Sequence, residues 1–244
     1  MSERFFSTQP ISGTQATLDG PEAHHLLNVM RAGVGTTVTL FDNSGAEFTA
    51  VVESIRRSEA TLHITERRET SRELSFSLTV GVALPKGDRQ KWLVEKLTEL
   101  GVTTLVPLIT ERGIAQPTAS AIERLSRSVI EAAKQCGRNR LMQIANPQPF
   151  STFVANPTAG DPRSPVTRRL IAHPHAPLLS TLEIRTPLPT AIAIGPEGGF
   201  ADVEVHSAAE AGWERVSLGG SILRIETAAI ALAAAIATNS APAS

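Results

Sequence analysis

Apolar runs of strand length alternate with segments of helical periodicity from about residue 74 onward. The apolar run 74–84 is followed by 86–101, where apolar residues recur every three or four positions until Gly101 supplies a helix stop. The alternation continues with predicted strands within 102–109, 168–174, 190–200 and 214–219 and predicted helices over 119–135, 202–212 and 224–238. Such alternation predicts an α/β fold, with a mostly parallel sheet covered by helices on both faces.

Three of these predicted strands end in loops rich in glycine or proline. They read IAHPH at 171–175, IAIGPEGGF at 192–200 and VSLGGSILR at 216–224. One such loop is the ordinary turn between a strand and a helix. Three of them at the carboxyl ends of parallel strands predict a pocket, because ligands of open α/β sheets bind there. Neither GxGxxG nor GxxxxGK[ST] occurs in the loops, so the common nucleotide-phosphate motifs are absent.

The first seventy residues have a different pattern. In 36–55 two β-type runs flank Asp-Asn-Ser-Gly at 42–45, which predicts a hairpin with a four-residue turn. A further strand is predicted over 59–69 and a short helix over 21–31. This part of the chain is therefore expected to form a small β-rich domain.

The overall charge does not indicate a nucleic-acid partner. The formal net charge is −1, with 23 basic residues among the 244. Most of the basic residues are arginines, and several stand in pairs such as Arg138 with Arg140. Because the planar guanidinium group suits phosphate and base edges, a local RNA-binding surface is compatible with this charge, as is an ordinary solvated surface.

The cysteine content and the N-terminal sequence bear on location. Cys136 is the one cysteine, so an internal disulfide is excluded and a reducing compartment is expected. The start MSERFFSTQP has no apolar core of signal-peptide length, and no run reaches the roughly 18 apolar residues of a membrane span. We therefore expect a cytoplasmic protein without membrane contact. Cys136 itself is expected to be a small buried apolar residue rather than a nucleophile.

Several motifs together resemble one family. They are IGPEGGF at 194–200, LGGSILRIETAAIALAA at 218–234, EAAKQCGRNR at 131–140, RFF at 4–6 and HHLLNVMR at 24–31. In this order they resemble the ribosomal RNA small subunit methyltransferase E family of the SPOUT class of RNA methyltransferases. The resemblance spans nearly the whole chain.

The resemblance implies a fold and an activity. It implies a PUA-like RNA-binding β-barrel domain over 1–72 and a SPOUT α/β domain over 73–244, whose C-terminal part forms a trefoil knot. It also implies a homodimer that uses S-adenosylmethionine to methylate N3 of one uridine near the decoding centre of 16S rRNA, either free or within the small ribosomal subunit. No DNA partner is implied.

The resemblance also implies site residues. The loops that would hold S-adenosylmethionine contain His173, Pro174, Ile194, Gly195, Pro196, Glu197, Gly198, Gly199, Leu218, Gly219, Ser221, Ile222 and Leu223. The residues expected to contact RNA are Arg4, Arg31, Arg138 and Arg140.

The chemistry narrows the catalytic candidates without choosing among them. Uracil N3 is a poor nucleophile until its proton leaves, so the site has to favour the deprotonated ring. A carboxylate that accepts the proton or an arginine that stabilises the anion would serve. The candidates are Glu197, Glu226, Arg224, Arg138 and Arg140, and the last two would equally reach phosphates.

Each candidate also has a structural interpretation. Glu197 would stabilise the N-terminus of the next helix, and Glu226 would pair with Arg224 or with the start of its own helix. His173 and His175 form an H-x-H pair, but no third ligand stands near them in the sequence, so no metal site is expected. The final helix is apolar nearly all round, which suits a helix between subunits or one within a core.

The sequence departs from the family pattern at three positions. Ser221 stands where arginine is common, Ile225 where threonine usually precedes the glutamate, and Lys134 where glutamate is usual. Two alternative functions also stay open. One is a noncatalytic RNA-binding homologue with a degenerate donor pocket, and the other is an unrelated α/β enzyme that holds a phosphorylated substrate in the three loops.

Overall fold

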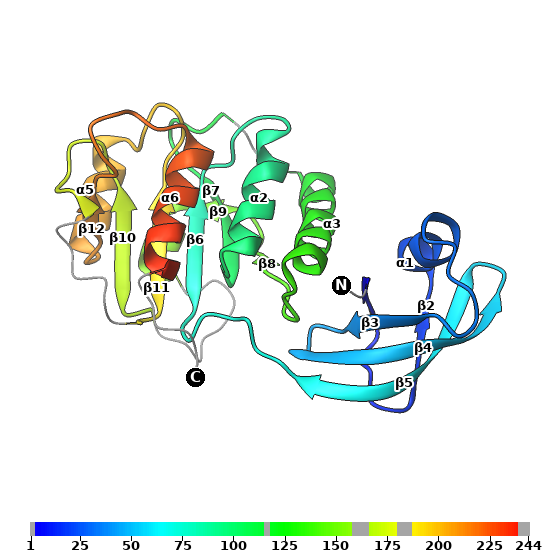
Figure 1. Cartoon of the computed structure of the whole chain (residues 1–244). Coiled ribbons are helices and arrows are strands. Elements are labelled where there is room, and N and C mark those ends of the chain that lie inside the picture. Colours follow the sequence, from blue (N-terminus) through cyan, green and yellow to red (C-terminus); the bar gives the residue numbers. More distant parts are fainter. Residues whose placement is uncertain (1–2, 115–117, 158–165, 180–186, 239–244) are drawn as a thin grey trace. The chain divides into compact units, whose positions relative to one another are not determined.

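The computed structural model describes residues 3–114, 118–157, 166–179 and 187–238 (Figure 1). The chain forms two compact units, Met1–Glu73 with Ala133–Leu141, and Leu74–Ala132 with Met142–Ser244. The domain boundaries 1–72 and 73–244 remain a prediction from sequence. The two units are defined by which residues pack together in the structure. Among the described residues, no helix is both long and apolar enough to cross a bilayer.

The first unit is built on a five-stranded sheet of order β1-β3-β4-β5-β2. Its strands are β1 (Arg4–Phe6), β2 (Gln15–Leu18), β3 (Thr37–Phe41), β4 (Ala46–Arg56) and β5 (Glu59–Glu69). All pairs are antiparallel except β1 with β3, which is parallel. The predicted turn at 42–45 joins β3 to β4, with Gly45 at φ +102°. Alternate residues of β4, such as Phe48, Ala50 and Val52, are buried in the core.

The short helix predicted over 21–31 is present as two consecutive helical segments. It forms as α1 (Gly20–His24), which continues as a π-helical segment, η1 (His25–Val29). The segment buries Ala23 and Leu26. The chain then leaves the helix at Arg31, which adopts a left-handed φ of +56°.

Residues 133–141 belong to the first unit, where side-chain hydrogen bonds attach them to the rest of that unit. Asn139 is 3% exposed, and its amide donates to the carbonyls of Gly45 and Thr70 and accepts from Nη2 of Arg4 at 2.5 Å. The Asn43 side chain accepts from the backbone N–H of Leu141 at 2.7 Å. This segment is therefore fixed to the hairpin by hydrogen bonds between residues about 100 positions apart.

Glu47 lies between two arginines of the first unit. Its Oε2 is 3.1 Å from Nη1 of Arg4 and 3.2 Å from Nη1 of Arg72, and its side chain is 17% exposed. Partial burial alone would raise the pKa of Glu47, but hydrogen bonds and charge from the two guanidinium groups outweigh burial and lower that pKa below its usual value of 4.5. The ionised carboxylate therefore stabilises the folded unit.

Replacing Glu47 by glutamine is expected to lower the free energy of unfolding at pH 7 by about 1–2 kcal/mol, since two charge-assisted hydrogen bonds are weakened. A carboxyl with a lowered folded pKa stabilises the fold above its unfolded pKa, and that contribution disappears as pH falls through the folded value. The difference between wild type and Glu47→Gln should therefore shrink below pH 4.5 in urea unfolding curves. Glu69→Gln, in an exposed pair with Arg67, is the control and should change stability little. A difference independent of pH would contradict the assignment.

The second unit contains a seven-stranded sheet in which every pair is parallel. Its strands are β6 (Leu78–Val82), β7 (Thr104–Ile109), β8 (Gln143–Ile144), β9 (Gln148–Pro149), β10 (Arg168–Ala172), β11 (Thr190–Ile194) and β12 (Glu214–Val216). The order is β12-β10-β11-β6-β7-β8, with β9 also paired to β7. The expected α/β fold class with a mostly parallel sheet is confirmed. Threading of the chain into a trefoil knot stays a prediction from the resemblance.

Five helices belong to the described α/β part of the chain. They are α2 (Arg89–Glu99), α3 (Ala119–Cys136), α4 (Phe150–Ala155), α5 (Asp202–Glu210) and α6 (Ile225–Thr238). Helices α2 and α6 pack together, and α6 lies on β6 and β11 (Figure 1). Helix α4 packs with α5, and its Phe153 joins Ala191 and Ala193 of β11 in one core cluster. Because side chains alternate along a strand, Ile192 and Ile194 point to the opposite face, where α6 lies.

Candidate functional site

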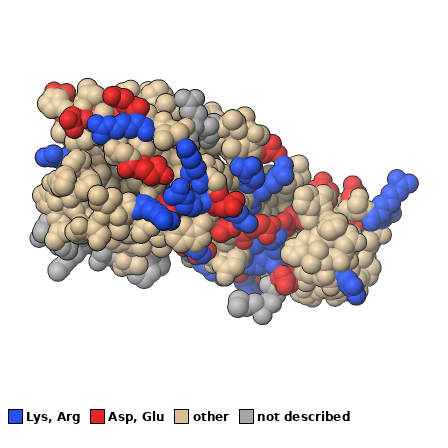
Figure 2. Space-filling model, turned by 90° about the horizontal axis from the view of Figure 1, so that it is seen from above, with Lys and Arg blue, Asp and Glu red and all other residues tan. Residues whose placement is uncertain are grey.

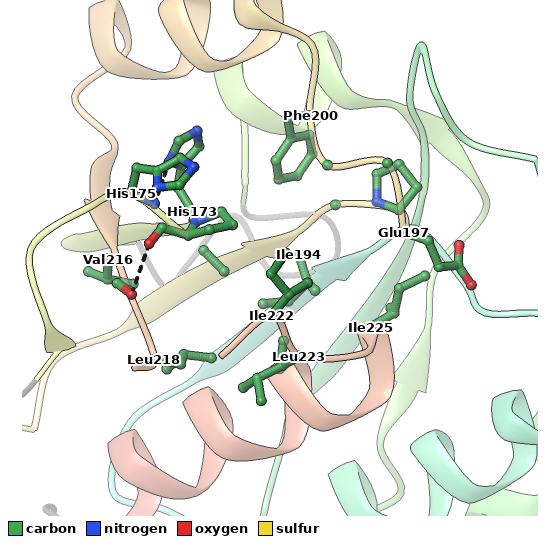
Figure 3. A pocket seen from close by; sticks show the side chains of 18 of the residues that line it. His173, His175, Ile194, Glu197, Phe200, Val216, Leu218, Ile222, Leu223 and Ile225 are labelled. Atoms are coloured by element: carbon green, nitrogen blue, oxygen red, sulfur yellow. Dashed lines mark hydrogen bonds between the residues drawn. The ribbon is translucent and has the colours of Figure 1, made fainter. Parts of the chain in front are cut away.

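A cavity of about 360 Å³ lies at the carboxyl ends of β10, β11 and β12 (Figure 3). These three strands are neighbours in the sheet, which brings their loops to one edge. Every residue predicted to bind the cofactor lines this cavity: His173, Pro174, Ile194, Gly195, Pro196, Glu197, Gly198, Gly199, Leu218, Gly219, Ser221, Ile222 and Leu223. The expected pocket is therefore present, while the binding role of each residue remains a prediction.

The loop after β11 turns sharply at its glycines. Gly199 has φ +69°, and its N–H donates to the carbonyl of Pro196 at 2.8 Å. A Cβ at Gly195 would lie 3.1 Å from the backbone nitrogen of Phe200, so this position has little room for a side chain. The ring of Phe200 packs on Phe150 with centroids 4.4 Å apart. The loop thus folds back on itself, and one end is held by the core.

The loops after β10 and β12 are hydrogen-bonded to each other. The backbone N–H of His173 donates to the carbonyl of Val216 at 2.9 Å. The N–H of Ser217 donates to the carbonyl of Pro177 at 2.8 Å, and its hydroxyl donates to that of Pro174 at 3.3 Å. These bonds connect two loops that are about forty residues apart in the sequence, and residues of both loops line the cavity.

The cavity wall is largely apolar, with a few polar groups. Figure 3 shows the side chains of Ile194, Leu223 and Phe200 around the hollow. The charged residues in the lining are Arg112, Glu197 and Asp202. Partial burial, with the positive charge of Arg215, lowers the pKa of His173 below its usual value of 6.5. This lowered pKa favours the neutral form of the His173 imidazole.

Sequence reasoning missed part of the lining. The lining residues that were not among the predicted binding residues are Arg112, Ala172, His175, Phe200, Asp202, Val216, Ser217, Ile225 and Ala228. Arg112 follows β7, which lies two places from β11 in the sheet. The rule that ligands bind at the carboxyl edge would have pointed to this loop also.

The three catalytic candidates of the second unit occupy different places. The carboxylate of Glu197 points away from the cavity in Figure 3 and lies 3.6 Å from Nη2 of Arg89. Glu226 is 4% exposed, and its Oε1 lies 3.6 Å from Nη1 of Arg89. Its Oε2 is buried without a hydrogen-bond partner in the described part of the chain. Arg224 is exposed between Leu223 and Ile225, which both line the cavity. Glu226 and Arg224 are not part of the lining.

The predicted RNA-contacting arginines all belong to the first unit, and they differ in exposure. Arg138 is 3% exposed and holds Glu73, with Nη2 2.5 Å from Oε2. The side chain of Arg4 is 14% exposed and contacts Glu47 and Asn139. Arg31 and Arg140 are exposed. Arg138 and Arg4 thus contribute to the packing of the unit, which leaves Arg31 and Arg140 accessible to a ligand.

The guanidinium group of Arg140 lies close to Gly45. A Cβ at Gly45 would lie 2.8–3.0 Å from Nη2, Cζ and Nε of Arg140, so the glycine leaves room for this group. Arg140 and Gly45 are part of the lining of a second hollow, of about 170 Å³, within the first unit. Figure 2 shows basic and acidic side chains interspersed on the face in view, in keeping with the near-neutral composition.

The three departures from the family pattern have identifiable surroundings. Lys134 pairs with Glu22 at 3.0 Å inside the first unit. Ser221 is exposed in the cavity lining, and Ile225 is 3% exposed there.

Cys136, which was expected to be buried, is half-buried. Among the described residues, no group of three His, Cys, Asp or Glu side chains is arranged to hold a metal ion.

Two family models match the chain. The one described as the RNA methyltransferase domain covers residues 72–237, and the one described as the RNA methyltransferase PUA domain covers 18–65. The chain is 35% identical to ribosomal RNA small subunit methyltransferase E of Synechocystis over 87% of this chain and 69% of the relative. It is 26% identical to the protein of that name from Bacillus subtilis, over 90% and 88% of the two chains.

Solved structures resemble the whole chain. Ribosomal RNA small subunit methyltransferase E of Neisseria gonorrhoeae, bound to S-adenosylmethionine, has a TM-score of 0.86 and 30% identity, covering 98% of both chains. A methyltransferase of Legionella pneumophila with bound S-adenosylmethionine has a TM-score of 0.88 and 29% identity, again over 98% of both chains. These likenesses agree with the resemblance seen in the sequence motifs.

Proposed function

Because the chain belongs to the ribosomal RNA small subunit methyltransferase E family, we propose that it transfers a methyl group from S-adenosylmethionine to N3 of one uridine in 16S rRNA. The observation that carries this proposal is the cavity formed by the three loops at the carboxyl edge of the parallel sheet. The alternative of a noncatalytic homologue with a degenerate cofactor pocket lacks support, because the three loops after β10, β11 and β12 line an open cavity.

The cavity suits the cofactor in size and lining. Its volume of about 360 Å³ is in the range of small-molecule pockets, and its apolar side chains, including Ile194, Leu218 and Leu223, offer a surface for a flat base. The glycines at 195, 198 and 199 permit close approach of a ligand to the backbone. S-adenosylmethionine supplies a methyl group that is already activated on a positively charged sulfur.

The protein has to favour the uracil anion, because N3 attacks only after it has lost its proton. We assign stabilisation of that anion to Arg224. It is exposed beside two cavity-lining residues and has no acidic partner within the described part of the chain. The N-terminus of α6, which begins at Ile225, adds a partial positive charge at the same place. Glu197 and Glu226 stay candidates for accepting the proton.

We assign RNA contacts to Arg31 and Arg140 of the first unit, since both are exposed and guanidinium groups bind phosphates well. The match of 18–65 to a PUA domain supports the assignment of Arg31, which lies within that range. A homodimer and a cytoplasmic location are part of the same proposal. The half-buried apolar residues Ile230, Ala231 and Ala234 of α6 support the homodimer, because they leave apolar surface available to a second copy.

The proposal predicts one new methyl group on 16S rRNA. Small ribosomal subunits from cells that lack the gene are incubated with the purified protein and S-adenosylmethionine, and the RNA is then mapped by mass. One uridine should gain one methyl group, and reverse transcription should stop there because N3 lies on the Watson–Crick edge. Naked 16S rRNA in a parallel reaction distinguishes the two substrate forms. A methyl group on a ribose 2′-oxygen, or an unchanged map, would contradict the proposal.

A further inference from the structure

The loop 195–200 contains glycine at three of its first five positions, Gly195, Gly198 and Gly199. Glycine loses more conformational freedom on ordering than other residues, so such a loop is costly to hold in one shape. If the loop adopts the binding shape in only a fraction of the molecules, the apparent affinity for the ligand is reduced by that fraction. Contacts that order this loop before the ligand arrives would therefore raise affinity.

Arg112 makes such contacts from the segment after β7. Its Nη1 donates to the carbonyl of Gly198 at 3.0 Å and to that of Phe200 at 3.4 Å. These two carbonyls flank Gly199, the residue with positive φ. A Cβ at Gly198 would lie 3.6 Å from Cβ and Cδ of Arg112, so the arginine stem also packs along the loop. One side chain thus holds both sides of the turn.

Neighbouring bonds reinforce this attachment. The N–H of Glu111 donates to Oε1 of Glu204 at 3.0 Å, and the other carboxylate oxygen of Glu204 accepts from the N–H of Ala201 at 2.8 Å. Ala201 directly precedes α5. The segment that carries Arg112 is therefore connected to the loop at its far end as well.

Arg89, the first residue of α2, approaches the loop through a different group. Its Nη2 lies 3.6 Å from Oε1 of Glu197, and its Nη1 lies 3.6 Å from Oε1 of the buried Glu226 at the start of α6. At these distances both interactions are ion pairs rather than hydrogen bonds. Arg89 thereby connects the acidic residue of the loop to the N-terminus of α6.

We propose that Arg112 and Arg89 are positioning residues, which hold the loop 195–200 in the shape that receives S-adenosylmethionine. The inference rests on the proposed function for the identity of the ligand, but the ordering of the loop does not depend on it. Arg112 has the larger effect, because it makes two charge-assisted hydrogen bonds to backbone whereas the 38% exposed side chain of Arg89 makes longer ion pairs.

The first measurement is amide hydrogen exchange of peptides spanning 195–200, without any ligand. Arg112→Ala should raise exchange of these amides about tenfold, and Arg89→Ala should raise it by a smaller factor. Arg112→Lys should lie between wild type and alanine, because an ammonium group can donate to one carbonyl but lacks the planar fork. Arg127→Ala, which removes an exposed arginine paired with Glu123 on α3, is the matched control and should leave the loop unchanged.

The second measurement is calorimetric binding of S-adenosylmethionine. Arg112→Ala should weaken binding about tenfold and Arg89→Ala about two- to fivefold, in the same order as the exchange rates. Thermal unfolding should change little in Arg112→Ala, because Arg112 is exposed and lies outside the core clusters. Arg89→Ala should lower the unfolding temperature, because it removes the ion-pair partner of the buried Glu226.

The outcomes separate this inference from the proposed function. Wild-type exchange and wild-type affinity in Arg112→Ala would overturn the positioning role, even if the protein methylates rRNA. A wild-type protein that binds no S-adenosylmethionine would contradict the proposed function, while the exchange measurement would still test the loop. Weaker binding with unchanged loop exchange would also overturn the inference, since Arg112 would then contact the ligand instead of ordering the loop.

Discussion

The substitution Ala228→Phe is expected to abolish S-adenosylmethionine binding. Ala228 lies on α6 one turn after Ile225, and both residues line the cavity, so the new ring would occupy space that the cofactor needs. Affinity should fall by at least about 100-fold, which corresponds to ~2.7 kcal/mol. Isothermal calorimetry on the purified variant measures this loss, and methyl transfer to small subunits should fall with it.

A series at the same position separates blocking from misfolding. Ala228→Ser is the size-matched control and should bind close to wild type, while Ala228→Val should be intermediate. Near-UV circular dichroism and thermal unfolding show whether Ala228→Phe retains its fold. A folded Ala228→Phe protein with wild-type affinity would mean that the cofactor binds elsewhere, and the assignment of the cavity would be wrong.

A methyl group at Gly81 is expected to destabilise the second unit by about 2–3 kcal/mol, as overpacking of a filled core does. A Cβ there would lie 2.5 Å from Cε1 and 2.6 Å from Cζ of Phe153, far inside contact distance. Phe153 is fully buried and packs on Trp213 with centroids 5.4 Å apart, so the ring has no free direction in which to move. The midpoint of thermal unfolding of Gly81→Ala should fall by roughly 4–12 °C.

A double substitution tests the cause. Gly81→Ala combined with Phe153→Leu should recover part of the loss, because the smaller side chain makes room at this point, and the coupling appears as non-additivity of the two single changes. Gly220→Ala is the control, since a Cβ there meets nothing within 4 Å. Equal and additive losses in the cycle would show that Gly81 is needed for its backbone rather than for the space beside Phe153.

Local sequence signals accounted for much of the α/β unit. Strands β6, β7, β10, β11 and β12 and helices α2, α3, α5 and α6 lie within or near the predicted segments, because apolar periodicity and glycine or proline stops act over a few neighbouring residues. Shorter elements were missed. The six residues of α4 are too few to show a period, and β1, β8 and β9 have two or three residues each.

The same local signals located the cavity. Loops rich in glycine or proline at the carboxyl ends of parallel strands form a pocket if the strands are neighbours, and β10, β11 and β12 belong to one continuous part of the sheet. The roles of individual charged residues were not predictable in this way. Arg138 and Arg140 are two positions apart in one motif, yet Arg138 is buried on Glu73 and Arg140 is exposed. Their exposure depends on partners more than sixty residues away.

The sequence alone determined most of the longer strands and helices, where the three loops begin, and which family the motifs resemble, because each of these signals lies in residues close together in the chain. Only the tertiary structure decided that β11 lies between β10 and β6, that Asn139 fixes its segment to the hairpin, and that Arg112 and Arg89 reach the loop 195–200. Apart from the pairing of β11 with β10, these contacts join positions between about 80 and 115 residues apart. No local pattern specifies such a pairing, since it is settled by how the whole chain buries its apolar surface and satisfies its polar groups.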